Sequence, residues 1–335
     1  MRALLPSLLL TLVLLLVNIF FGSISLPMTD IFQALCSPSE VDAVARFVVY
    51  ESRLPSALTA VLAGASLSVA GLVMQTIFAN PLADPSILGV NAGAGLGAAV
   101  AMLLLGGTLS VGGVGLSGFL LTVCSAFVGA MAVILLLLLC SARLRSNLLL
   151  LIAGMMVSFV VGALISLLSY FSTSQGVHSF VIWGLGDFSG VPLSRMPLFA
   201  ALLLLSMAGI ALCAKPLNAL LLGNDYATNL GMPIRQVRTW LLLLTGLLTA
   251  IVTAACGPIS FLGLAVPHVA RLTLRTSNHR VLVPVTMLWG SAIALLCLFI
   301  TRLPADGTLL PLGAITPLMG VPVVLYILFC RRSIL

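Results

Sequence analysis

Few residues in this sequence of 335 residues could perform acid–base chemistry inside a membrane. Every Asp and Glu falls in a predicted loop or at the edge of a predicted helix, and so do His178 and His279. A transporter driven by protons or sodium usually carries ionisable residues within its spans, because these residues bind the coupling ion. His268 falls within a predicted half-length helix, but a single histidine beside a proline is more often a capped structural residue. The sequence therefore predicts no coupling site for an ion-driven transporter.

Signatures of ATP hydrolysis, covalent catalysis and metal binding are also missing from the sequence. The only lysine, Lys215, is not preceded by the glycine spacing of a phosphate-binding loop. An intramembrane protease would need a Ser–His or paired-Asp arrangement at helical spacing, and none is present. The 7 cysteines form no C-x-x-C pair, and Cys36 alone falls in an outer loop. We therefore predict that the chain is not an enzyme, that it holds no metal or cofactor of its own, and that partners supply the energy.

The elements that position these residues are predicted to be membrane helices. Apolar side chains make up 61% of the sequence and charged ones 7%, which a water-soluble core could not accommodate. The net charge of +7 comes from scattered arginines at loop edges, so it indicates membrane orientation rather than nucleic-acid binding. We therefore expect an all-α polytopic membrane protein.

One stretch predicts a broken helix. Residues 237–270 are almost all apolar, with basic residues at both edges, and they are too many for a single span of about 20 residues. Gly257-Pro258 supplies a turn, because Pro lacks an N–H and Gly tolerates unusual backbone angles. We predict a full helix that ends at Ala255, followed by a half-length helix over 259–270 that returns to the same side. The backbone groups freed at the break must be buried in protein.

Hydropathy predicts ten spans, including the half-length helix. Residues 1–25 also have the features of a signal peptide, but the spans behind them favour an uncleaved first helix. A polar stretch over 22–51 is expected to lie on the outer membrane surface. The predicted spans cover residues 4–21, 54–78, 89–105, 116–140, 148–171, 196–214, 237–255, 259–270, 281–300 and 310–330.

The basic residues fix the predicted orientation, since Arg and Lys mark the cytoplasmic side. Outer segments hold Arg46, Arg53, Arg195 and Arg302, and both termini are predicted to be cytoplasmic. Inner segments hold the remaining eleven of the 15 basic residues: Arg2, Arg143, Arg145, Lys215, Arg235, Arg238, Arg271, Arg275, Arg280, Arg331 and Arg332.

Several segments resemble the permease subunits of the ABC importers that bring iron-siderophores, haem or cobalamin across the bacterial inner membrane. The resemblance covers nearly the whole chain and implies the type II ABC importer permease fold, with residues 1–335 as a single transmembrane permease domain. Ser56 departs from the family, which often has a second Arg after Arg-Leu-Pro. The segments are Arg53-Leu-Pro, Gly71-Leu-Val-Met-Gln75, Asn80-Pro-Leu-Ala-Asp-Pro-Ser-Ile-Leu-Gly-Val, Gly257-Pro-Ile-Ser-Phe-Leu-Gly-Leu-Ala-Val-Pro-His-Val-Ala-Arg271 and Leu310-Pro-Leu-Gly313.

The resemblance also implies partners. The family works as a permease homodimer or a pair of related permeases, with two ATP-binding cassette subunits inside and a periplasmic substrate-binding protein outside. ATP and Mg are expected in the ATPase subunits. Arg53 and Arg302 are the implied docking residues for carboxylates of the binding protein. The alternative for both is a single solvated arginine at a helix end.

Residues 217–232 are similar to the paired coupling helices that contact the ATPase, and the alternative for them is an ordinary polar inner loop. The contact residues implied there are Gly223, Asn224, Asp225, Ala227 and Leu230. The implied inner gate residues are Asn80, Leu82, Ser146 and Asn147. Possible lining residues of the path are Gln75, Met155 and Met156, for which helix packing is an equal alternative.

We therefore expect the permease subunit of an ATP-driven importer for an iron-siderophore complex. Haem and cobalamin remain alternatives as the ligand. An ion-coupled secondary transporter with broken helices is an alternative of a different class.

Overall fold

The computed structural model describes residues 4–24, 26–37, 41–111, 114–144, 146–304 and 308–330. The predicted cytoplasmic termini and four of the inner arginines, Arg2, Arg145, Arg331 and Arg332, lie outside the described residues. The helices are α1 (Leu4–Phe20), α2 (Met28–Cys36), α3 (Ala43–Phe47), η1 (Val48–Arg53), α4 (Leu54–Ile77), α5 (Val90–Ala99), η2 (Val100–Leu104), α6 (Gly118–Arg143), α7 (Asn147–Phe171), α8 (Ser174–Gly184), α9 (Met196–Leu212), α10 (Ala214–Leu220), α11 (Asn224–Asn229), α12 (Ile234–Cys256), α13 (Leu262–Leu274), α14 (His279–Thr301) and α15 (Leu312–Cys330).

The predicted all-helical class is confirmed, with one small addition. Strands β1 (Thr108–Val111) and β2 (Val114–Ser117) pair antiparallel between η2 and α6. Glycines at positive φ, Gly106 and Gly107 before β1 and Gly118 after β2, allow the tight reversals there. A short hairpin therefore connects the predicted third and fourth spans.

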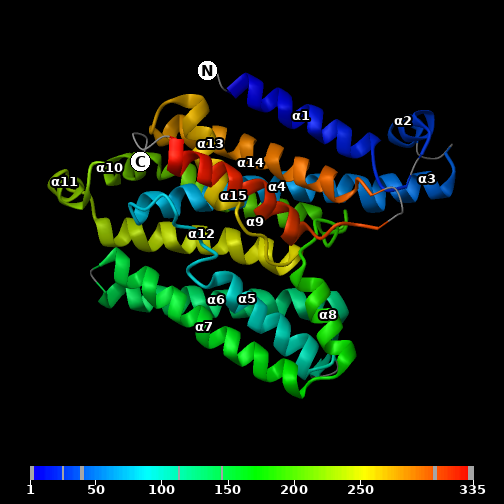
Figure 1. The fold of residues 1–335 in the computed structure, drawn as a ribbon, viewed down its shortest axis with the longest axis horizontal. Coiled ribbons are helices and arrows are strands. Elements are labelled where there is room, and N and C mark those ends of the chain that lie inside the picture. Colours follow the sequence, from blue (N-terminus) through cyan, green and yellow to red (C-terminus); the bar gives the residue numbers. More distant parts are fainter. Residues whose placement is uncertain are drawn as a thin grey trace.

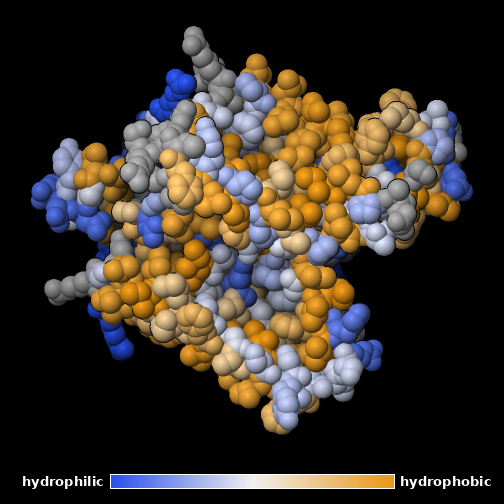
Figure 2. Space-filling model, viewed as in Figure 1, coloured by the Kyte–Doolittle hydropathy of each residue, from blue (hydrophilic) through white to orange (hydrophobic). Residues whose placement is uncertain are grey.

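Several described helices are long and apolar enough to cross a membrane. These are the continuous run over residues 43–77, then α6, α7, α12 and α14, while α9 and α10 form a pair bent by 53° that could make one more span. Helices α1, α13 and α15 and the joined α5 and η2 are apolar but shorter. Figure 2 shows apolar side chains over much of the surface between two ends where hydrophilic residues gather. The chain is thus a multi-pass membrane protein.

The second predicted span begins earlier than expected. Helix α3 continues through the π-helical turn η1 into α4, so a single helical run starts at Ala43 rather than at Leu54. Pro55 lies in the first turn of α4, where its missing N–H does not interrupt the helix. Part of the stretch predicted to rest on the outer surface is therefore the first section of this helix.

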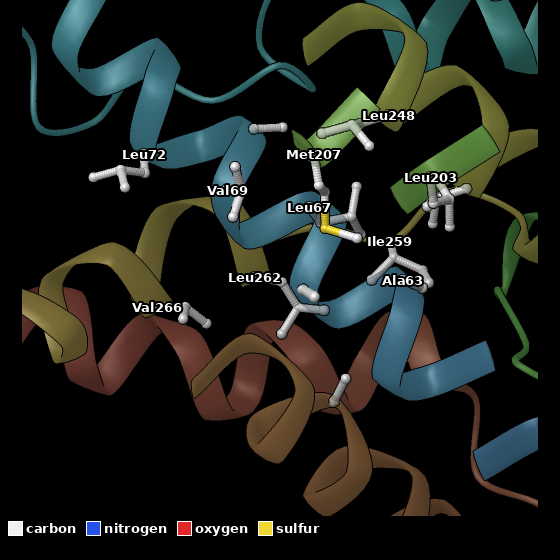
Figure 3. Packing of buried hydrophobic residues seen from close by; sticks show 14 of the residues in the cluster. Ala63, Leu67, Val69, Leu72, Leu203, Met207, Leu248, Ile259, Leu262 and Val266 are labelled. Atoms are coloured by element: carbon white, nitrogen blue, oxygen red, sulfur yellow. The ribbon is translucent and has the colours of Figure 1, made fainter. Parts of the chain in front are cut away.

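Helix α4 is the central element of the bundle. In the helical run over residues 43–77, which contains α4, 83% of the most apolar stretch is buried inside the protein. Helices α14, α12, α13 and α9 pack around α4 (Figure 1). Glycines allow two of these approaches: a Cβ at Gly71 would lie 2.0 Å from the Gly263 oxygen of α13, and one at Gly64 would lie 2.3 Å from the Gly290 oxygen of α14. Small residues at such contacts let membrane helices approach closely. Figure 3 shows the apolar side chains that fill the remaining space, among them Leu67 of α4 and Leu248 of α12.

The predicted broken helix is present. Helix α12 ends at Cys256, Gly257 turns the chain at φ +74°, and the half-length helix α13 starts at Leu262, three residues later than predicted from position 259. The residues between them are not helical, and Phe261, immediately before α13, has a left-handed backbone at φ +70°. The freed carbonyl of Cys256 accepts a hydrogen bond from the backbone N of Asp187 at 2.8 Å. The prediction that the backbone groups freed at the break lie buried in protein is therefore confirmed for the carbonyl of Cys256.

Candidate functional site

Two short helices, α10 and α11, project from one end of the molecule (Figure 1). Gly223 separates them at φ +98°, a left-handed backbone angle that other residues rarely adopt. Ala227 is fully buried, whereas Leu230 is 62% exposed and Asn224 and Asp225 are exposed beside it. The two-helix arrangement predicted over 217–232 is confirmed, and the first helix begins at Ala214. The exposed face of α11 is available for contact with another protein.

Asn218 connects α10 to the membrane helices. Its side-chain oxygen accepts a hydrogen bond from the backbone N of His279 at 2.8 Å and lies 2.9 Å from Nδ1 of the same residue. Nε2 of His279 lies 2.9 Å from the hydroxyl oxygen of Thr76, near the C-terminal end of α4. A row of polar contacts therefore runs from α10 through the start of α14 to the central helix. Sequence analysis missed Asn218, because a single polar residue in an inner loop gives no signal of its partner.

Gln75 and Arg271 form a second polar link at the same depth. Nη1 of Arg271 donates to the side-chain oxygen of Gln75 at 2.7 Å. The amide nitrogen of Gln75 donates to the backbone oxygens of Leu264 at 3.2 Å and Gly263 at 3.4 Å. Gln75 is only 4% exposed, so its amide binds α13 inside the bundle of one chain. Whether it also lines a path stays a prediction.

The loop between α4 and α5 contains the predicted gate residues Asn80 and Leu82. The side-chain oxygen of Asn80 accepts a hydrogen bond from the backbone N of Leu82 at 2.9 Å, which is the local turn-forming role of an asparagine. Leu82 itself is 41% exposed. Nε2 of His268 lies 3.0 Å from the oxygen of Pro81, so this histidine is a satisfied structural residue, as expected. The loop is thereby fixed to α13.

Asp84 is a buried carboxylate in the same loop. It is 6% exposed, and its Oδ1 accepts a hydrogen bond from the backbone N of Ser86 at 2.8 Å. Burial raises the pKa of Asp84 above its usual value, against the lowering effect of the hydrogen bonds from Ser86. In the described part of the chain, no group of three or more His, Cys, Asp or Glu could hold a metal ion.

The other predicted gate residues, Ser146 and Asn147, stand at the start of α7. The hydroxyl of Ser146 caps this helix by accepting from the backbone N of Leu149 at 3.5 Å. The side chain of Asn147 lies outside the described part of the structure. Met155 is half-buried and Met156 is 50% exposed on the same helix. The two gate pairs occupy separate loops of one chain, and their gating role stays a prediction.

Arg53 lies at the end of the bundle opposite α10 and α11 (Figure 1), where it binds the end of α1. It is 2% exposed, and its guanidinium donates to the backbone oxygens of Ile19 at 3.0 Å, Phe20 at 2.9 Å and Ile24 at 2.5 Å. These carbonyls have no partner within α1, and a cation near a helix C-terminus is stabilising. The guanidinium is therefore used inside the chain. Its predicted position on the outer side stays a prediction, and sequence analysis did not predict this partner.

Arg302 approaches the same helix end from α14. It donates to the backbone oxygen of Asn18 at 3.2 Å and to the hydroxyl of Ser56. Burial and the nearby charge of Arg53 lower the pKa of Arg302 to about 10, although Asp187 raises it. Ser56, the departure from the family pattern, thus supplies an acceptor to Arg302 in a position where another arginine would add repulsion.

A cavity of about 320 Å³ opens beside Arg302. Asp187 and Ser189 line it from the loop after α8, and Leu310 lines it from the segment before α15. The half-buried Arg302 therefore borders a space whose walls include the carboxylate of Asp187 as well as apolar side chains. Of the two predicted docking residues, Arg302 is the one that borders such a space, and the docking role of both stays a prediction.

The comparisons agree with the geometry. Residues 10–330 match the profile of the FecCD transport family. The vitamin B12 import system permease protein BtuC of Klebsiella pneumoniae subsp. pneumoniae is 35% identical over 320 residues, which cover 93% of this chain and 94% of that protein. The protein of the same name from Citrobacter koseri is 38% identical over 284 residues, which cover 85% and 83%.

Solved structures show the same architecture. One described as an inward-facing conformation of a metal-chelate type ABC transporter aligns at a TM-score of 0.83 with 30% identity, over 97% of this chain and 99% of that one. PsaBC from Streptococcus pneumoniae aligns at a TM-score of 0.59 with 16% identity, over 92% and 97%, and supports the fold alone. The chain therefore belongs to the FecCD transport family of ABC importer permeases.

Proposed function

We propose that this chain is the permease subunit of an ATP-driven importer that carries a large metal chelate across the bacterial inner membrane. Separate ATPase subunits bind ATP and Mg and hydrolyse the nucleotide. The observation that carries the proposal is the pair α10 and α11, which presents an exposed face at one end and is linked by Asn218, His279 and Thr76 to the central helix. A chain with no predicted coupling-ion site needs such a contact to receive its driving force.

The ligand is proposed from the relatives. An iron-siderophore complex was the first expectation, but the similar curated permeases are named for vitamin B12, at 35% and 38% identity. Cobalamin is therefore the first ligand to test, and an iron-siderophore complex is the second. Haem is the third.

The proposed topology has ten spans within one permease domain, formed by α1, α4, α5 with η2, α6, α7, α9, α12, α13, α14 and α15. Helix α1 begins and α15 ends toward the end of the molecule that bears α10 and α11 (Figure 1), which supports two cytoplasmic termini. Basic residues predicted to lie on the inner side include Lys215 on α10, Arg235 at the start of α12 and Arg280 at the start of α14.

A second permease copy is proposed to cover α7. Only 17% of the most apolar stretch of α7 is buried within this chain. The helix also contains the small residues Ser158, Gly162 and Ser166. Small residues on an exposed membrane helix favour close packing with another helix. A path between two copies would then be bordered by α7, which carries Met155 and Met156.

The test is uptake in a strain that lacks the chromosomal gene for this chain. Growth that depends on external cobalamin should be restored by the intact chain and not by a variant with Asp225→Arg and Leu230→Asp, because these changes alter the exposed face of α11. Restoration of siderophore-dependent iron uptake alone would replace cobalamin as the ligand. Full uptake by the α11 variant would overturn the proposed contact with the ATPase.

A further inference from the structure

A second cavity lies on the side of the bundle, and neither α7 nor the residues of the polar links line it. It has a volume of about 320 Å³ and opens between α6, α9 and α12. Its walls include Phe119, Val123 and Phe127 of α6, Leu202 of α9, and Ile251 and Ala254 of α12. We call it the lateral cavity. Its walls are almost entirely apolar, so a polar chelate would lose its hydrogen bonds with water there without compensation.

In the proposed topology, the lateral cavity faces the membrane near its outer surface. Helices α6 and α9 begin beside it and α12 ends beside it, so all three contribute their outer ends. Leu198 on its rim is 67% exposed, and Leu205 further along α9 is 74% exposed. In a bilayer, such leucines contact lipid. The cavity therefore opens to the hydrocarbon just below the outer headgroup layer.

One cation stands at the mouth of the lateral cavity. Arg195 is exposed at the start of α9, and its guanidinium carbon lies 5.9 Å from the centre of the Phe119 ring. Among the described residues, its side chain makes no hydrogen bond and no ion pair, in contrast to Arg53 and Arg302, which bind carbonyls of α1. A guanidinium held over an aromatic ring, with free N–H groups, matches the geometry of phosphate.

We propose that the lateral cavity binds an anionic phospholipid of the outer leaflet, with one acyl chain among the apolar walls and the phosphate bound by Arg195. The charge of Arg195 and the apolar walls are complementary to the two parts of such a lipid, and an arginine at a membrane interface extends its charged end toward the headgroups. The volume is at the lower limit of ligand sites, which suits a length of acyl chain rather than a whole chelate.

A bound lipid would contact a structural junction of the permease. Gly190 lines the lateral cavity, and a Cβ at Gly190 would lie 2.5 Å from the backbone oxygen of Ala255. The same loop donates the hydrogen bond from Asp187 that closes the broken end of α12. The lipid would therefore support the contact between this loop and the break between α12 and α13.

The test is native mass spectrometry of the purified permease with phosphatidylglycerol or phosphatidylcholine of identical acyl chains. The intact chain should retain phosphatidylglycerol preferentially. Arg195→Gln should weaken this binding by about tenfold, as expected for the loss of one hydrogen-bonded charge pair, and Arg195→Lys should restore part of it. The matched control is Arg46→Gln, which removes an exposed arginine on the same side of the protein but at a different pocket.

A second variant and a second measurement locate the acyl chain. Cys124→Phe places a larger side chain on the exposed wall of the lateral cavity, and it should reduce the binding of both lipids. A phosphatidylglycerol with a photoreactive group in its acyl chain should label peptides of α6 and α9 in the intact protein. Equal binding by the Arg195→Gln and Arg46→Gln variants would overturn the proposal. So would labelling confined to other helices, or crosslinks that show a protein subunit covering the cavity.

Discussion

The carboxylate of Asp84 occupies the space that a side chain at position 263 would need: a Cβ built on Gly263 would lie 2.1 Å from Oδ2 of Asp84. Asp84 belongs to the loop between α4 and α5 and Gly263 to the first turn of α13, so this contact fixes the loop to the half-length helix. The glycine is also close to α4, because a Cβ on Gly71 would meet its backbone. Three segments distant in sequence therefore meet at one glycine.

The raised pKa of Asp84 predicts a pH-dependent stability. A buried carboxyl whose pKa is raised in the folded state stabilises the fold most when it is protonated, and that stability is lost as pH rises from about 4 through its raised value. The Asp84→Asn substitution preserves the shape of the side chain but removes its charge. We expect the melting temperature of this variant to rise relative to that of the intact chain between pH 4 and pH 7, as measured in detergent. Parallel pH profiles of the two proteins would contradict this account.

Gly263→Ala should be strongly destabilising. The added methyl group would collide with Asp84 and with the backbone oxygen of Leu67, and overpacking typically costs about 1–3 kcal/mol. Thermal unfolding measures the loss. Gly184→Ala is the matched control, because a Cβ at Gly184, the last residue of α8, meets nothing within 4 Å. Equal melting temperatures for the two variants would show that the three segments do not pack as described.

The link between Gln75 and Arg271 predicts a coupled effect on stability. Arg271→Met leaves the Gln75 oxygen without its partner, and a buried polar group without a partner costs about 1–3 kcal/mol. Adding Gln75→Leu should cost less than the sum of the two single changes, because neither partner is then left alone. Unfolding of the two single variants and the double variant measures this interaction. Strict additivity would mean that the two side chains act independently.

The row Asn218–His279–Thr76 predicts a separation of ATP hydrolysis from transport. Asn218→Leu removes the acceptor that joins α10 to α14, so movement of α10 should reach α4 less effectively. In proteoliposomes with the ATPase and binding protein, we expect hydrolysis to persist while uptake falls several-fold. Gln236→Leu is the control, since Gln236 is an exposed residue at the start of α12 on the same side. If both variants transport equally, the row does not carry the coupling.

Much of the fold was predictable because hydropathy and turn residues act locally. The basic residues at both edges of 237–270 and Gly257-Pro258 predicted the break between α12 and α13, and Gly223 predicted the separation of α10 from α11. The helical run that contains α4 starts at Ala43, earlier than predicted, because charged residues such as Glu51 and Arg53 made the preceding helix look like a surface segment.

The partners of the polar residues were harder to predict. Arg53 was predicted to lie at the outer end by its sequence position, but the carbonyls that it binds belong to the last residues of α1 and to Ile24 beyond it, more than twenty residues earlier in the chain. His279 and Asn218 are 61 residues apart. Such pairs are set by how the helices pack, and the pattern of one sequence does not contain that information.

The central claim is that this permease moves its ligand only when an ATPase engages α10 and α11. The most direct measurement is uptake of labelled cobalamin into proteoliposomes that hold the purified permease, with or without the ATPase subunits, the binding protein and ATP. We expect accumulation above the external concentration only when all of these components are present. Uphill accumulation by the permease alone, under a proton or sodium gradient, would contradict the account.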